Sequence, residues 1–93
     1  MAKEYYIGKL VCSKAGRDKG KYYIITDILE DSRYVYVVDG IYRPLEKPKK
    51  KKIKHLMFTN INLRDINKDQ IVDKFNNPTI KKFIQSHQFD KEV

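Results

Sequence analysis

Apolar residues in the first sixty positions fall in short runs separated by polar loops, a pattern typical of β-strands. Val, Ile, Tyr and Thr favour strands, and they are concentrated in the segments 7–12, 22–29 and 34–38. The segment 53–58 has enough apolar residues for a closing strand. The Asp39-Gly40 pair is a strong signal for a turn after the third run. The pattern therefore predicts a small antiparallel sheet or barrel.

The hydrophobic period changes after position 60. Asn67, followed three residues later by Gln70, predicts the start of a helix whose apolar face holds Ile71, Val72 and Phe75. Asn77-Pro78 restarts the pattern, and Ile80, Phe83 and Ile84 follow at helical spacing. We therefore expect a domain over 1–60 and a two-helix C-terminal appendage over 61–93.

Charge is concentrated in the first part of the chain. The 93 residues carry a net charge of +8, and the segment 1–60 holds fourteen Lys or Arg against seven Asp or Glu. Such an excess favours anionic partners such as nucleic acid. The longest apolar runs are far shorter than the roughly 20 residues of a membrane span, so we expect a cytoplasmic protein that does not enter a membrane.

The chain offers little for catalysis or metal binding. Cys12, His55 and His87 are too few soft ligands for a structural zinc site, and Cys12 is expected to be a packed strand residue. The acidic residues Asp69 and Asp73 are explained by a solvated helix face. We expect no enzymatic activity, no metal and no cofactor.

The loop that follows the first predicted strand is the first candidate binding segment. Gly16 and Gly20 permit a tight reversal with positive φ. The basic residues of this 13–21 loop are Lys14, Arg17, Lys19 and Lys21. Arg presents a planar fork to phosphate or a guanine edge, whereas Lys offers a mobile point charge. An ordinary solvated hairpin connection with surface charge explains the same spacing equally well.

The residues from Ile7 to Lys21, together with those from Val35 to Gly40, resemble a KOW motif. Within that superfamily the chain is most similar to the branch of the L14e-type ribosomal proteins and to small bacterial KOW-domain RNA-binding proteins. The basic segment 47–56 adds to the resemblance, which covers about residues 5–60. It implies an SH3-like β-barrel, mainly β, whose loops bind RNA, commonly ribosomal RNA. KOW modules also occur in transcription elongation factors, where they can contact protein.

The second candidate segment is the basic stretch 47–54. Five lysines lie within six residues, namely Lys49, Lys50, Lys51, Lys52 and Lys54, and His55 follows them. Their mutual repulsion should keep the stretch extended and exposed until an anion neutralises it. Tyr42 could stack on an unpaired base and Arg43 could read a base edge or a phosphate, although Tyr42 could instead cover one end of the barrel.

Together these features predict a non-catalytic RNA-binding module that contacts ribosomal RNA or the ribosome through the 13–21 loop and the stretch 47–54. The alternative is a protein-interaction module of the transcription or ribosome-assembly machinery. In that alternative the apolar groove of the barrel or the C-terminal helices bind a protein partner, and Ile80, Phe83 and Ile84 matter more than the lysines. A DNA-binding module is a third possibility.

Overall fold

A computed structural model describes residues 6–29, 33–65 and 75–92 of the chain. Its strands are β1 (Lys9–Ser13), β2 (Tyr22–Ile28), β3 (Tyr34–Val38), β4 (Lys49–Lys52) and β5 (Leu56–Asn62). Two short 3-10 turns, η1 (Ile53–His55) and η2 (Leu63–Asp65), precede and follow β5, and one α-helix, α2, spans Asn77–Glu92. The described part of the protein is therefore mainly β, as the sequence predicted.

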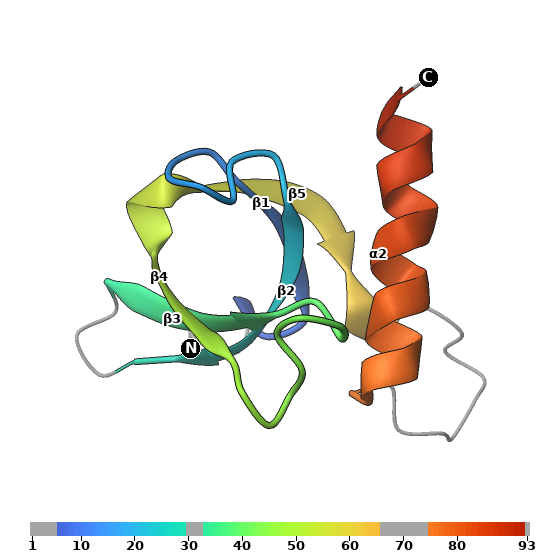
Figure 1. The fold of residues 1–93 in the computed structure, drawn as a ribbon, viewed down its shortest axis with the longest axis horizontal. Helices are drawn as coiled ribbons and strands as arrows, with labels where there is room; N and C mark the ends of the chain where they lie inside the picture. Colours follow the sequence, from blue (N-terminus) through green and yellow to red (C-terminus); the bar gives the residue numbers. More distant parts are fainter. Residues whose placement is uncertain (1–5, 30–32, 66–74, 93) are drawn as a thin grey trace.

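The five strands form one antiparallel sheet in the order β4-β3-β2-β1-β5. The sheet curls strongly, so that its edge strands β4 and β5 approach one another and are joined by η1 (Figure 1). Among the described residues no ladder pairs β4 with β5, so the sheet is not closed into a barrel. The structure thus bears out the coarse fold class, an antiparallel β-sheet with a helical C-terminal part.

The sheet buries apolar side chains on both of its faces. The inner face of the curl holds Val11, Tyr23, Ile25, Val35, Val37 and Leu56. The outer face of β1 and β2, with Val38 and Leu63, packs against α2 through Leu10, Cys12, Tyr22, Ile24, Ile80, Phe83 and Ile84. All of β1 and the first four residues of β2 are buried, because their inner face packs inside the curl and their outer face packs against α2. This explains the continuous apolar runs there, since only a strand with one solvated face alternates strictly.

The C-terminal part contains one α-helix among the described residues, not the two that were expected. The first expected helix lies outside the described residues except at Phe75, which is not helical. The second is present as α2, whose first turn is capped by Asn76: its Oδ1 accepts a hydrogen bond of 2.9 Å from the backbone N–H of Thr79. Pro78 fits in the first turn, where no helical hydrogen bond requires its nitrogen.

The stretch 47–58 differs most from its prediction. The lysine run is indeed extended, but it forms β4 paired with β3, with Tyr36 opposite Lys50, and is not a free segment. The expected closing strand 53–58 begins instead as the turn η1, and β5 runs from Leu56 to Asn62. Backbone pairing with β3 and one buried carboxylate together offset the repulsion between the lysines, as described below.

Candidate nucleic-acid interface

The lysines of β4 alternate between the two faces of the sheet. Residues that face each other on paired strands share a face, and Lys49 and Lys51 lie opposite the inner-face residues Val37 and Val35. Lys49 and Lys51 therefore point into the mouth of the curled sheet, where their side chains are only 31% and 10% exposed. Lys50 and Lys52 point outward and are exposed. The lysine run is consequently divided into an inner pair and an outer pair.

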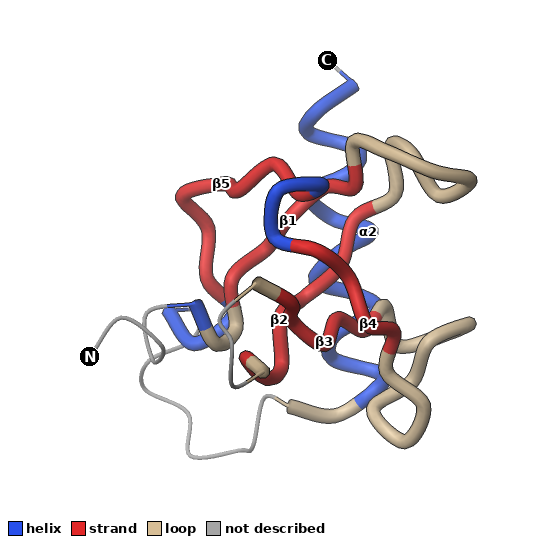
Figure 2. Tube along the Cα trace, turned by 90° about the vertical axis from the view of Figure 1, so that its left-hand side faces the viewer, coloured by secondary structure: helices blue, strands red, loops and turns tan. Residues whose placement is uncertain are grey.

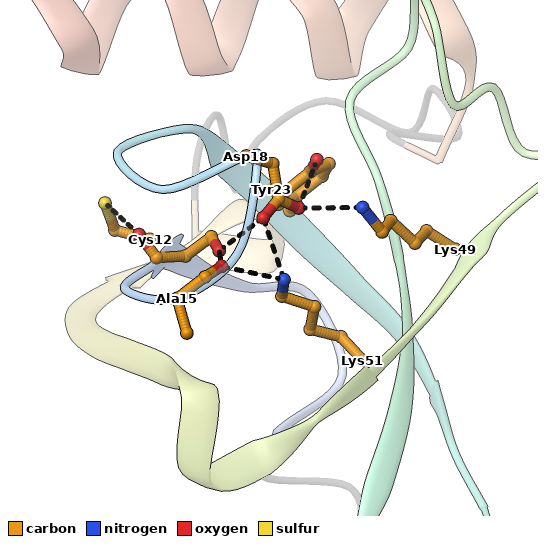
Figure 3. A network of polar contacts seen from close by, with 7 residues as sticks. Cys12, Ala15, Asp18, Tyr23, Lys49 and Lys51 are labelled. Atoms are coloured by element: carbon orange, nitrogen blue, oxygen red, sulfur yellow. Dashed lines mark hydrogen bonds and ion pairs between the residues drawn. The ribbon is translucent and has the colours of Figure 1, made fainter.

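Asp18 of the 13–21 loop neutralises the inner pair (Figure 3). Lys51 Nζ lies 2.8 Å from Asp18 Oδ1, and Lys49 Nζ lies 3.0 Å from Asp18 Oδ2. The Ser13 hydroxyl donates to Oδ1 at 2.8 Å, and the Tyr23 hydroxyl donates to Oδ2 at 2.9 Å. Asp18 is itself buried, with 7% of its side chain exposed. One carboxylate thus joins the loop to β1, β2 and β4.

The protonation of this network is fixed by its hydrogen bonds. Burial alone would raise the pKa of Asp18, but the hydrogen bonds from Lys51, Ser13, Lys49 and Tyr23 outweigh it and hold the pKa well below its ordinary range. The pKa of Tyr23 is raised, first by burial and then by its bond to the Asp18 carboxylate. Asp18 is therefore charged and Tyr23 is a neutral donor across the physiological range. Lys49 and Lys51 are both already paired with the Asp18 carboxylate.

The outer lysines are arranged around an aromatic ring. Lys50 Nζ lies 4.6 Å from the centroid of the Tyr34 ring, and Lys52 Nζ lies 6.0 Å from it. Lys54, in η1, is also exposed. Within the described segments no ion pair engages Lys50, Lys52 or Lys54, since the salt bridges there are those of Lys49 and Lys51. These three ammonium groups are therefore available to an anion.

The 13–21 loop holds its own cations next to β4 and η1. Gly16 and Gly20 adopt the positive φ values expected from the sequence, +83° and +91°. The backbone N–H of Lys14 donates to the His55 carbonyl at 2.9 Å, which ties the loop to η1. The side chains of Lys14, Arg17, Lys19 and Lys21 are exposed, whereas that of His55 is half-buried. Cations thus flank β4 from the loop and from its own outer face.

Tyr42 and Arg43 lie on a second loop, 39–48. This loop and the 13–21 loop project from the same side of the sheet (Figure 2). The Asp39 carboxylate organises it by accepting hydrogen bonds of 2.8 Å from the backbone N–H groups of Ile41 and Arg43. Tyr42 is 76% exposed, so it does not cover the end of the sheet, and Lys21 Nζ lies 5.1 Å from its ring centroid. The sequence-predicted aromatic contact is therefore solvent-accessible and next to a loop cation.

A pocket of about 450 Å³ opens beside β4 at a place the sequence analysis did not identify. Its walls are Arg33, Tyr34, Lys52, Ile53 and Lys54. The backbone N–H of Ile53 donates to the Arg33 carbonyl at 2.9 Å, which holds η1 against the start of β3. Tyr34 lies on the face of β3 opposite Val35, because successive residues of a strand alternate between the two faces. Only the pairing of β3 with β4 shows that the outer lysines share that face.

The apolar helix residues of the alternative partner site are buried in the structure. Ile80, Phe83 and Ile84 are 0%, 5% and 5% exposed, because α2 uses this face to cover the sheet. Cys12 is buried in the same core, as expected. The described residues contain no cluster of three His, Cys, Asp or Glu side chains that could hold a metal ion. No helix in the described part of the chain is long and apolar enough to span a membrane.

No protein-family model matches the chain, and no curated protein matches it either. Its functional interpretation therefore depends on its own residues and their geometry.

Proposed function

We propose that this protein is a non-catalytic RNA-binding module that contacts ribosomal RNA through the 13–21 loop and the outward lysines of β4 and η1. The observation that carries the proposal is the division of the lysine strand. Lys49 and Lys51 anchor the strand to Asp18, whereas Lys50 and Lys52 are held outward at fixed positions and have no acidic partner among the described residues.

The charge of the two segments supports a polyanionic ligand. Together, 13–21 and 47–54 hold ten Lys or Arg and one acid, Asp18, which is already paired. Each lysine that neutralises a phosphate of a single strand releases counterions, with a slope of about −0.7 in log K against log salt. Tyr42 and Arg43 add an exposed aromatic ring and a guanidinium on the neighbouring loop. Aromatic rings beside cations suit RNA, whose unpaired bases stack on them.

The fold we propose is an SH3-like barrel of the KOW type that is open between β4 and β5, and the setting is the ribosome in the cytoplasm. Support comes from the curled five-stranded antiparallel sheet and from the KOW-like residues of β1, the 13–21 loop and β3. Crosslinking the protein to RNA in its native cells, followed by sequencing, tests the setting. Crosslinks concentrated in one region of ribosomal RNA are expected, whereas scattered crosslinks would contradict a specific ribosomal site.

A pair of matched double variants tests the RNA contact itself. In the first, Lys50→Gln and Lys52→Gln remove two outer charges; in the control, Lys81→Gln and Lys82→Gln remove two exposed charges from α2. Fluorescence anisotropy with a labelled single-stranded RNA is measured at several salt concentrations. We expect the first variant to bind more weakly than the wild type, and its slope of log K against log salt to be less steep by about 1.4, which is about 0.7 for each lysine. The control should keep both the affinity and the slope of the wild type.

The inner lysines must be left intact in this test. Replacing all four lysines of β4 would also remove both partners of the buried Asp18, so a loss of folding would be mistaken for a loss of contacts. Equal binding by the two double variants would show that the outer lysines are a general source of charge and not the contact surface, and the proposal would then fail.

A further inference from the structure

The pocket beside β4 combines an aromatic ring, an aliphatic side chain and cations. Tyr34 and Ile53 provide its apolar surface, and Lys52, Lys54 and Arg33 provide its charge. We propose that this pocket binds one unpaired nucleotide of the RNA, with the base on Tyr34 and Ile53 and the adjacent phosphates on Lys52 and Lys54. The inference depends on the proposed function and adds to it the structural class of the RNA: a single strand, loop or bulge.

The size and chemistry of the pocket fit a nucleotide. Its volume of about 450 Å³ lies at the lower end of the range, about 300–1,000 Å³, that is typical of small-molecule sites. Tyr34 is half-buried, so its side chain has less conformational freedom to lose on binding than a fully exposed one. Lys52 and Lys54 follow one another along β4 and η1 on either side of Ile53, so they can bind phosphates that flank one base.

The lysines near the Tyr34 ring do not prevent a base from stacking there. An exposed cation over an aromatic ring is worth about 0.5–1 kcal/mol, whereas stacking of a base on an aromatic side chain is worth about 1–3 kcal/mol. An incoming phosphate also attracts Lys50 and Lys52 more strongly than the ring does, because it carries a full charge. The binding free energy is therefore favourable when the lysines move from the ring to the phosphates and the base takes their place on the ring.

The same pocket discriminates against a regular duplex. A paired base is already stacked between its neighbours, and taking it out of the helix costs a few kcal/mol. That cost is comparable to the whole gain from stacking on Tyr34, so a duplex keeps only its phosphate contacts. An unpaired base needs much less free energy to reach the pocket, so it retains the full stacking free energy on Tyr34. The difference between the two ligands therefore measures the aromatic contribution separately from the charge.

The test uses the full chain, a short unstructured RNA and an RNA duplex of the same length. Tyr34→Leu removes the aromatic face, Tyr34→Phe keeps it, and Tyr36→Leu is the control on the same strand and face but outside the pocket. We expect Tyr34→Leu to weaken single-strand binding at least about fivefold and to leave duplex binding unchanged within about twofold. Tyr34→Phe and Tyr36→Leu should match the wild type on both RNAs.

The possible results separate the inference from the function on which it depends. If the wild type binds RNA and Tyr34→Leu weakens both RNAs equally or neither, the nucleotide pocket is wrong and the RNA-binding module stands. If the wild type binds neither RNA, both fail. Should Tyr34→Leu not fold, NMR of the wild type decides: adenosine 5′-monophosphate must shift the Tyr34 ring and Ile53 methyl signals, and ribose 5-phosphate must not. Equal shifts with both compounds would overturn base stacking.

Discussion

Replacing Asp18 by Asn tests whether one carboxylate holds the 13–21 loop and β4 together. The change keeps the shape of the side chain but removes the charge that Lys49 and Lys51 neutralise. Removing one partner of a buried ion pair costs about 3–5 kcal/mol of stability. The ion pair between Asp18 and Lys51 is buried in this sense, because the Lys51 side chain is only 10% exposed. Lys49 is more exposed and adds less than about 1 kcal/mol. Because Asn still accepts one hydrogen bond, we expect a loss of about 3 kcal/mol.

A loss of that size is large for this chain. A domain of 93 residues has a free energy of unfolding of roughly 5–14 kcal/mol, and about 3 kcal/mol corresponds to a fall in Tm of roughly 12–24 °C. Thermal unfolding followed by circular dichroism measures the shift. The control is Asp27→Asn, which removes the same charge from an exposed position on β2 and should cost less than about 0.5 kcal/mol. A loss below about 1 kcal/mol for Asp18→Asn would refute the reasoning.

The remaining predictions concern pH, one glycine and the helix. The pKa of Asp18 is held below its ordinary 3.8 in the folded state, so its stabilisation is present above pH 3.8 and is lost as the pH falls toward the folded-state pKa. The stability gap between wild type and Asp18→Asn, measured by urea unfolding, should therefore narrow between neutral pH and pH about 2; a constant gap would exclude this linkage. Gly40→Ala should destabilise by at least about 1 kcal/mol in urea, because Gly40 has φ +82° and a Cβ there would lie 2.6 Å from the Asn77 carbonyl oxygen. If α2 is part of the folded core, Ile80→Ala should lower the free energy of unfolding by about 2–5 kcal/mol, and Lys81→Ala should leave it almost unchanged. Equal, small losses of stability in the two variants would contradict the packing of α2 on the sheet.

The first three strands and the apolar face of α2 could be predicted because local composition decides them. The run 22–29 is so rich in β-branched and aromatic residues that β2 follows from propensity alone. Ile80, Phe83 and Ile84 recur at helical spacing, and the structure buries all three. Gly16 and Gly20 occupy positive φ because the reversal between β1 and β2 requires it. In each of these cases the deciding information lies within a few residues.

The lysine run could not be predicted in the same way because its structure is decided at long range. Local repulsion indicated an exposed segment, but β3 supplies backbone partners and Asp18, thirty-three residues before Lys51, supplies the compensating charge. In the sequence Asp18 is one acid among the bases of the 13–21 loop, and nothing near it in the chain points to Lys49 or Lys51. The pocket on Tyr34 was missed for the same reason, since its walls come from the start of β3 and from the β4–η1 junction.

Asp18 also fixes which lysines face solvent. A shift of one residue between β4 and β3 would turn every side chain of β4 to the opposite face. Lys50 and Lys52 would then enter the mouth of the sheet, and Lys49 and Lys51 would lie outside. A strand of four identical residues carries no information of its own against such a shift. The paired carboxylate supplies that information, because its two oxygens take Lys49 and Lys51 together. The buried ion pairs thus orient the lysines that we propose contact RNA, without touching the RNA themselves.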